Sequence, residues 1–366
     1  RQAAARSNQS VVSASNKMES LWGAPATVIV LTRDEMVRRG YRELDEILDD
    51  LPGMEVSRPY GDTFFKNYWR GFRNTFGDPF LVLVDGVVFN HMWGHNVQAP
   101  LATFPLSMVA RVEVVYGPAS VVYGADAFMG VINIITDKRS AGTGSHTRAT
   151  LSGGSWDRRI ADLATTWREG KLVLSLAARF DNGSLDEAAM ERYEYTKKQY
   201  YADPRIWDAL YRDNPSFGPL RPPGWRNQAM HLRAAVEGTE FVYTHLVLST
   251  GYGTAYAADQ AQANGRWVRT EDSFHLRHER DLSEVLHSTT LVRWRSSGFP
   301  SDSFDIEGYF DKGQKSYVNL FTYWSAANRS RSLFQDFDLW LNWRCSLNFG
   351  FKYEQKDLQK AYDTSP

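Results

Sequence analysis

Apolar and polar residues alternate along several segments after Thr136. In one of these segments the apolar positions are Leu172, Leu174, Leu176, Ala178 and Phe180, and the residues between and beside them include Lys171, Ser175, Arg179 and Asp181. Successive side chains of a β-strand point to opposite faces of its sheet. The alternation therefore predicts a strand with one apolar and one charged face.

The same alternation occurs twice near the end of the chain. The first run carries Phe337, Leu339, Leu341 and Trp343, and the second carries Leu347, Phe349, Phe351 and Tyr353. Only a couple of residues around Cys345 separate these two runs, whereas long polar segments such as 185–212 separate others. Short turns at one edge and long loops at the other are typical of an outer-membrane β-barrel. A soluble β-sandwich alternates in the same way, so the pattern alone leaves both architectures open.

Residues 26–136 show shorter elements of two kinds. Residues 26–31 predict a strand, and Thr32 with Glu35 forms a capping box for a helix that ends at Gly40. A second helix, which ends at Pro52-Gly53, has four apolar residues on one face: Leu44, Ile47, Leu48 and Leu51. Three further strands are predicted at 80–84, 109–115 and 131–136, with a helical turn from Pro118 to Gly124 before the last. These elements predict a small α+β domain.

The second predicted helix also has an acidic face. Its residues are Glu43, Asp45, Glu46, Asp49 and Asp50. We interpret this face as solvated rather than as a metal site, because acidic clusters on a helix are usually hydrated surface.

Composition narrows the class of protein. The net charge of −1 over 366 residues gives no basic excess for nucleic-acid binding. The mean hydropathy of −0.44 is compatible with a barrel, because only every second residue of a membrane strand faces lipid. The 12 Trp and 18 Tyr would suit the aromatic girdles of a barrel or a carbohydrate-binding surface. The single cysteine, Cys345, excludes an internal disulfide. The longest apolar stretch, at 80–89, is interrupted by Asp85 and Gly86 and is too short for a membrane helix.

Four sequence blocks occur in a fixed order over about 90 residues. They are LDDLPGMEV at 48–56, WRGF at 69–72, LVLVDGV at 81–87 and FPLSMVARVEVVYGPASVVYGADAFMGVINIIT at 104–136. Together they resemble the plug signature of TonB-dependent outer-membrane receptors, in particular the vitamin B12 and ferric-siderophore group. One departure is Tyr116, since many members of the family carry Arg before Gly-Pro.

The resemblance implies a fold and a domain organisation. We expect a flexible arm at 1–23, an α+β plug domain with a small mixed sheet and short helices at 24–138, and antiparallel transmembrane β-barrel strands at 139–366. Plugged barrels have about 22 strands of roughly 9–11 membrane residues each. Only 230 residues follow Thr136, and we find about eight to ten candidate strands. We therefore expect the barrel to be incomplete in this chain.

The resemblance also implies roles for particular residues. Ser10, Val11, Val12, Ser13 and Ala14 look like the TonB box, a β-prone strip that could add as a strand to the sheet of TonB. Arg70 is expected in a buried structural ion pair of the plug. Other structural residues of the plug motifs are Gly71, Asp85, Gly86, Arg111, Glu113, Gly117, Pro118, Tyr123, Gly124, Gly130 and Asn133.

Two loops of the plug are candidates for contact with cargo. In the family the corresponding loops face the extracellular side, and here their candidate residues are Arg58, Tyr60, Phe64, Asn90, His91, Trp93 and His95. We expect no bound metal ion of the protein itself. His275 and His278 lie three apart in a predicted strand and point to opposite faces, so they cannot chelate one ion.

The expected function is energy-coupled uptake, not enzymatic catalysis. No nucleophile elbow, Walker loop or dinucleotide fingerprint is present, and no cofactor is expected. The expected partners are TonB with its inner-membrane complex, a metal-chelate cargo and outer-membrane lipid, in a Gram-negative bacterium. A signal-transducing, colicin or phage receptor, a haem or oligosaccharide receptor on the same scaffold, and a soluble β-rich carbohydrate-binding protein remain alternatives.

Overall fold

The computed structural model describes residues 10–11, 13, 19–20, 26–57, 66–72, 77–78, 80–92, 94, 96–119, 123, 127–138, 143–155, 157–184, 224–251, 266–311, 313, 316–342 and 345–364. The chain divides into two compact units. The first comprises Arg1–Arg58 and Phe65–Arg139, and the second comprises Pro59–Phe64 and Ser140–Pro366.

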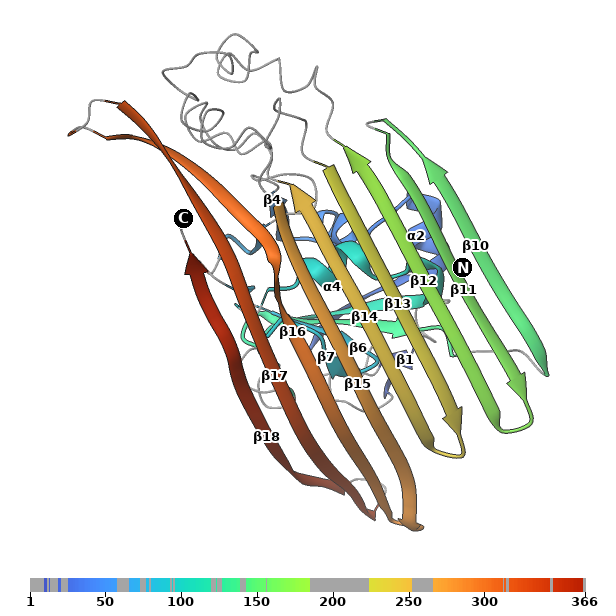
Figure 1. Ribbon diagram of the computed structural model, residues 1–366. Helices are drawn as coiled ribbons and strands as arrows, with labels where there is room; N and C mark the ends of the chain where they lie inside the picture. Colours follow the sequence, from blue (N-terminus) through green and yellow to red (C-terminus); the bar gives the residue numbers. More distant parts are fainter. Residues whose placement is uncertain are drawn as a thin grey trace. The chain divides into compact units, whose positions relative to one another are not determined.

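A five-stranded mixed sheet organises the first unit (Figure 1). Its order is β3 (Thr27–Thr32), β8 (Val109–Tyr116), β9 (Gly130–Thr136), β6 (Leu81–Val84) and β7 (Val87–Val88). Strands β6 and β9 run parallel, and the other neighbours are antiparallel. All four residues of β6 are buried, as expected for a central strand.

Two small strand pairs complete the sheets of this unit. Strand β1 (Ser10–Val11) pairs with β2 (Glu19–Ser20), and β4 (Met54–Ser57) pairs with β5 (Lys66–Trp69). One buried apolar cluster on a face of the main sheet consists of Leu81, Leu83, Val115, Ala119, Ala127 and Val131. Burial of this apolar surface is the main force that holds the unit together.

The helices are short: the first begins and ends where the sequence predicts, the second ends at Asp49, before the predicted Pro52-Gly53, and the other two lie where the sequence predicted no helix. In α2 (Arg33–Arg39) the hydroxyl of Thr32 accepts a hydrogen bond from the Glu35 amide at 3.4 Å, and Gly40 ends the helix with a left-handed φ of 77°. Helix α3 spans Leu44–Asp49, α4 spans Gln98–Thr103, and a 3₁₀ helix spans Leu106–Met108.

The acidic face of α3 differs from its prediction. Glu43 and Asp45 are buried, whereas Asp49 and Asp50 are exposed. Helix α3 contacts both β4 and α4, so packing covers more than its apolar face. The prediction of a uniformly solvated acidic face is therefore wrong for Glu43 and Asp45.

A nine-stranded antiparallel sheet forms the second unit, with each strand hydrogen-bonded to the next one in sequence. The strands are β10 (Gly144–Gly153), β11 (Arg159–Glu169), β12 (Leu172–Ser184), β13 (Gly224–Val236), β14 (Thr239–Gly251), β15 (Arg266–Ser283), β16 (Leu286–Asp311), β17 (Ser316–Asn342) and β18 (Cys345–Thr364). The predicted order, a small mixed sheet with short helices followed by antiparallel barrel strands, is confirmed. Among the described residues, β10 and β18 stay at opposite edges, so the sheet is not closed.

The connections of this sheet differ in length between its two edges. Two-residue turns join β11 to β12, β13 to β14, β15 to β16 and β17 to β18. In the turn between β13 and β14, both Glu237 and Gly238 have positive φ, of 46° and 77°, as a type I′ hairpin requires. At the opposite edge, 39 residues separate β12 from β13 and 14 separate β14 from β15.

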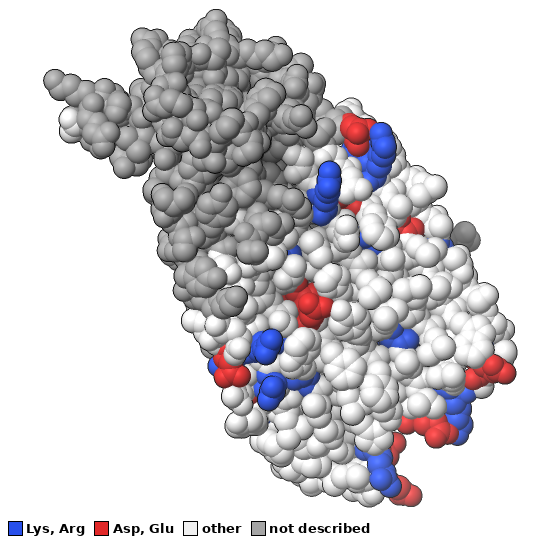
Figure 2. Space-filling model, in the orientation of Figure 1, with Lys and Arg blue, Asp and Glu red and all other residues white. Residues whose placement is uncertain are grey.

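The charged face of this sheet is buried and its apolar face is exposed, which is the reverse of the arrangement in water-soluble proteins. On β12 the charged residues Arg179 and Asp181 are 2% and 0% exposed, whereas Leu174 and Phe180 are 42% and 50% exposed. The exposed apolar face continues across the sheet with Leu232, Phe241, Phe274, Val292, Leu347, Phe349 and Phe351. In Figure 2 the face turned to the viewer is mostly uncharged, with scattered basic and acidic residues. An apolar face that stays exposed is expected when lipid rather than water surrounds it.

No helix among the described residues is both long and apolar enough to cross a membrane.

Candidate functional site

The N-terminal arm contacts the centre of the mixed sheet through Ser13. The backbone N–H and the hydroxyl of Ser13 both donate to Oε2 of Glu113, at 3.0 and 2.6 Å. Ser13 and Glu113 are each completely buried. Three residues before this contact, Ser10 pairs with Ser20 in the β1–β2 ladder. Val12 and Ala14 lie outside the described residues. Within its described residues the arm therefore pairs with itself at Ser10 and Ser20 and contacts the mixed sheet through Ser13.

The carboxylate of Glu113 is held on both of its oxygens. Arg111, which is two residues away on β8, donates to Oε1 through Nε and a terminal nitrogen, each at 2.7 Å. On β9, the amide of Asn133 donates to the Ser13 hydroxyl at 2.9 Å. Burying a carboxylate costs free energy unless charge and hydrogen bonds compensate for its lost hydration. Ser13 supplies part of that compensation, so the arm contributes to the polar network of the sheet.

Asn133 also connects this network to the turn between β6 and β7. Its side-chain oxygen accepts from the Gly86 amide at 3.1 Å. Asp85 and Gly86 have φ values of 48° and 80°, which fit a type I′ turn. The Asp85 carboxylate accepts from the amide and hydroxyl of Thr136, at 3.0 and 2.6 Å. The Val-Asp-Gly block therefore acts as a turn that is fastened to β9.

Trp69 and Arg70 have different surroundings. Trp69 is completely buried between Phe80 and Tyr116, with ring centroids 5.1 and 5.2 Å away. Arg70 is exposed, and its guanidinium lies 5.6 Å from the centre of the Tyr116 ring. The expectation that Arg70 is buried in an ion pair is wrong, because its positive φ of 50° turns the chain after the buried Trp69.

Aromatic packing explains why the plug motif has a glycine at position 130. A Cβ at Gly130 would come within 2.6 Å of the Trp69 ring and 2.3 Å of the Val115 carbonyl, so only glycine fits.

Burial raises the pKa of the Tyr116 phenol, and the nearby Arg70 partly opposes this shift. Burial also raises the pKa of the Tyr123 phenol. Gly71 and Gly117 have positive φ, Pro118 is exposed, and Gly124 lies outside the described residues.

The two predicted cargo loops are only partly described. Asn90 is buried, accepts from the Val82 amide at 2.8 Å and donates to the Phe80 carbonyl at 3.0 Å. His91 is also buried, and its amide donates to the Asn96 carbonyl at 2.8 Å. Both residues thus hold the segment after β7 in place, and their contact with cargo stays a prediction. The other candidates, Arg58, Tyr60, Phe64, Trp93 and His95, lie outside the described residues.

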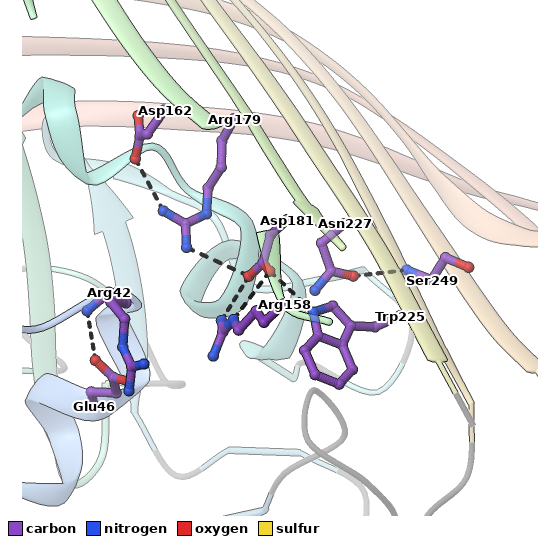
Figure 3. A network of polar contacts seen from close by, with 9 residues as sticks. All are labelled: Arg42, Glu46, Arg158, Asp162, Arg179, Asp181, Trp225, Asn227 and Ser249. Carbon is purple, nitrogen blue, oxygen red and sulfur yellow. Dashed lines mark hydrogen bonds and ion pairs between the residues drawn. The ribbon is translucent and has the colours of Figure 1, made fainter. Parts of the chain in front are cut away.

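The buried face of the nine-stranded sheet carries a network of ion pairs whose partners the sequence did not predict. Asp181 accepts from Arg158 at 2.8 Å, from the Trp225 indole at 3.1 Å, and lies 3.6 Å from Arg179 (Figure 3). Arg179 also donates to Asp162, its direct partner across β11 and β12, at 3.0 Å. The alternation placed Arg179 and Asp181 on one face, but only the strand register brings Asp162 and Trp225 to them.

The described residues contain no group of three or more His, Cys, Asp or Glu side chains that could hold a metal ion. On β15, His275 is buried and His278 is exposed, as expected for residues three apart in a strand.

The sequence profile of the TonB-dependent Receptor Plug Domain family matches residues 20–131, which include four strands of the mixed sheet (β3, β8, β6 and β7) and the start of the fifth, β9. The chain carries a TonB-dependent receptor plug domain. The predicted resemblance to TonB-dependent receptors, with a plug followed by part of a barrel, is confirmed. The matched range contains Glu113 and the cluster around Trp69, and Ser13 and Asn133, which complete the polar network, lie just outside it.

Solved structures extend the similarity to the nine-stranded sheet. The Pseudomonas aeruginosa ferripyoverdine receptor bound to ferripyoverdine matches with a TM-score of 0.66, 15% identity, 95% of this chain and 44% of that chain. The ferric preacinetobactin receptor BauA of Acinetobacter baumannii matches with a TM-score of 0.64 and 14% identity, and the match covers 98% of this chain and 50% of that chain. The ferric-catecholate import receptor Fiu of E. coli K12 matches with a TM-score of 0.62 and 13% identity, and the match covers 94% of this chain and 51% of that chain. The chain thus spans about half the length of the structures it matches, and at this identity the match establishes the fold.

Proposed function

We propose that the whole protein is a TonB-dependent outer-membrane receptor for energy-coupled uptake of a scarce metal chelate of the ferric-siderophore or cobalamin type. The observation that carries this proposal is the plug domain at residues 20–131, followed by a sheet whose apolar face is exposed and whose charged face is buried. That sheet suits a bacterial outer membrane, because lipid stabilises its exposed apolar side chains.

The protein would act as a gated binding site rather than as an enzyme. Cargo would bind between the extracellular end of the plug and the long loops of the barrel. The expected domain boundaries, an arm at 1–23, a plug at 24–138 and barrel strands at 139–366, remain part of this proposal. The predicted cargo residues remain candidates: Arg58, Tyr60, Phe64, Asn90, His91, Trp93 and His95.

The arm would couple the plug to TonB. Residues 10–14 would bind TonB by adding a strand to its sheet, and TonB would transmit the proton-motive force of the inner membrane as a pull. In the described state Ser13 is buried against Glu113. Breaking this contact would be the first step of coupling, because a buried Ser13 cannot pair with a second protein.

An iron chelate is the favoured cargo. The solved structures named above are receptors for ferripyoverdine, ferric preacinetobactin and ferric catecholates. The test is uptake of radiolabelled iron chelates and of radiolabelled cobalamin by cells that carry the full-length gene or a deletion of it. Uptake of an iron chelate that needs both the gene and TonB supports the proposal. Uptake of cobalamin alone would show that the cargo is of the cobalamin type. No uptake of either compound would contradict the proposal.

The TonB box can be tested in the same cells. Val12→Pro removes a backbone donor and should abolish uptake without changing binding of cargo to whole cells. Ala4→Pro places the same restriction in the same arm, outside the predicted box, and should leave uptake intact. If Val12→Pro cells transport normally, residues 10–14 are not the TonB box.

A further inference from the structure

The strip that would bind TonB, residues 10–14, is already paired with another part of the arm. Strand β1 lies inside this strip, and β2 pairs with it antiparallel, with Ser10 opposite Ser20 and Val11 opposite Glu19. In an antiparallel pair, one of two successive residues directs both its N–H and its C=O at the opposite strand. Backbone groups of the strip are therefore bonded to β2.

Ser13 engages the strip at a second point. It lies in a turn rather than in a strand, and its backbone N–H donates to Oε2 of Glu113 at 3.0 Å. Both residues are completely buried. Strand addition needs an extended segment whose N–H and C=O groups are accessible along one edge. At Ser13 the strip is neither extended nor accessible, so TonB cannot add a strand there in this state.

The contact of Ser13 with Glu113 also supports the pairing of β1 with β2. A ladder of two residues is too short to be stable by itself. Ser13 lies two residues after the end of β1, and its contact fixes the backbone there, which lowers the conformational entropy that pairing must overcome. The ladder is thereby held in place, but it remains weak enough for a longer strand to displace it.

From these contacts we propose that β2 is an autoinhibitory strand, which competes with TonB for the backbone of Ser10 and Val11. The inference rests on the proposed function, because it takes residues 10–14 as the TonB box. TonB would pair along the whole strip, a longer ladder than the two positions of β1, and so displace β2. Only molecules in which β2 is detached would bind TonB, and this lowers the apparent affinity.

The alternative arrangement is that TonB adds to the edge of β1 that faces away from β2. The pair of β1 and β2 would then stay intact and dock as one unit. The turn at Ser13 opposes this arrangement, because a strand added there would meet the turn two residues after the end of β1. So short a ladder provides few main-chain hydrogen bonds, and these are the main source of affinity in strand addition.

A disulfide that locks β1 to β2 distinguishes the two arrangements. The variant is S10C/S20C in a Cys345→Ser background, because Cys345 is exposed and would otherwise take part in thiol exchange. Directly paired residues of an antiparallel ladder have Cα atoms about 4.5–5.5 Å apart, a separation that a disulfide can span. The matched control is T147C/T165C in the same background, which links a directly paired couple on β10 and β11.

The measurement is binding of the periplasmic domain of TonB to the full-length protein in detergent micelles, before and after reduction. We expect oxidised S10C/S20C to bind this domain at least about tenfold more weakly than the same variant after reduction. T147C/T165C should bind it equally in both states. Equal binding by oxidised and reduced S10C/S20C would overturn the inference, because TonB would then use the other edge of β1. Absence of binding to the wild type would contradict the proposed TonB box itself.

A second variant tests the competition from the opposite direction. E19P/S20P removes both backbone donors of β2 and leaves the strip unchanged. It should bind the TonB domain about three- to tenfold more tightly than the wild type, because one or two hydrogen bonds no longer compete. A3P/A4P, in the same arm but outside the strip, should bind like the wild type. Unchanged or weaker binding by E19P/S20P would show that β2 is not a competitor and would overturn the inference.

Discussion

Ser13 donates two hydrogen bonds to the buried carboxylate of Glu113, although 100 residues separate them in the chain. The contact joins the N-terminal arm to strand β8 of the mixed sheet. It gives the arm a defined docked state, and the free energy of that state determines how readily the arm is released.

Ser13→Ala should loosen the arm. The substitution removes the hydrogen bond from the hydroxyl to Glu113 and the one from Asn133, which costs about 1–2 kcal/mol for bonds to a charged, buried group. Amide exchange at residues 10–20 should become about tenfold faster in peptide-level mass spectrometry. The control Thr147→Ala removes an exposed hydroxyl from β10 and should leave that exchange unchanged. Unchanged exchange in Ser13→Ala would show that the contact does not retain the arm.

Glu113→Gln should destabilise the plug. The neutral amide no longer balances the charge of Arg111. Its NH2 group is a donor that would face the donors of either Arg111 or Ser13. Because the Arg111 side chain is 27% exposed, part of the loss is screened, and we expect about 1–3 kcal/mol. Urea unfolding followed by tryptophan fluorescence measures this loss. Glu35→Gln, in an exposed i,i+4 pair with Arg39, should change stability by no more than about 0.5 kcal/mol.

Gly130→Ala should disrupt the cluster around Trp69. The added methyl group would collide with the Val115 carbonyl and the Trp69 ring, and the strand cannot move without breaking its ladder to β8. Overpacking of this kind costs about 1–3 kcal/mol or more. The same unfolding measurement applies, with Gly154→Ala as the control, since nothing lies within 4 Å of a Cβ there. Equal stability of both variants would mean that the cluster adapts.

Tyr123→Phe should raise the stability of the plug at alkaline pH. Burial raises the pKa of Tyr123 in the folded state, so the unfolded chain loses its proton first as the pH rises. The stability that the neutral phenol contributes is therefore complete below about pH 10 and declines above it. Phenylalanine removes this decline, which a series of unfolding curves from pH 8 to 11 would detect.

The same substitution at Tyr41 provides the contrast. Burial also raises the pKa of Tyr41, but its hydroxyl donates to Asp50. The Tyr123 hydroxyl has no hydrogen-bond partner among the described residues. Tyr41→Phe should therefore lower stability slightly at pH 7, whereas Tyr123→Phe should leave it unchanged or increase it by up to about 1 kcal/mol. A large loss in Tyr123→Phe at pH 7 would indicate a partner for its hydroxyl.

Phe349→Arg should impair insertion of the barrel. Phe349 is 47% exposed on the apolar face, and a guanidinium within the hydrocarbon costs about 2–4 kcal/mol at the bilayer midplane. Asn348→Arg, one residue away on the opposite face, places the charge beside Asp338 and should be tolerated. Folding into vesicles, read by heat-modifiable migration, compares the two. Equal folding of both variants would contradict the assignment of the faces to lipid and interior.

The local patterns predicted a large part of the fold. The N-cap at Thr32, the glycine at the end of α2 and the apolar face of α3 are signals within a few residues, and each occurs as predicted. The alternation on β12, β17 and β18 likewise shows which residues share a face. The loops gave weaker predictions. Asn90 and His91 have the side chains of a binding loop, but they hold the backbone around β6.

The sequence by itself determined which residues form strands and helices, which face of each strand is apolar, and that the ordered motif blocks belong to a plug. Those properties depend on residues close together in the chain. Only the tertiary structure decided that Ser13 contacts Glu113, that Asp162 and Trp225 join Arg179 and Asp181, and that Glu43 and Asp45 are buried. These contacts depend on strand register and on packing between distant segments. The alternation of apolar and polar residues within one strand or helix gives no information about either.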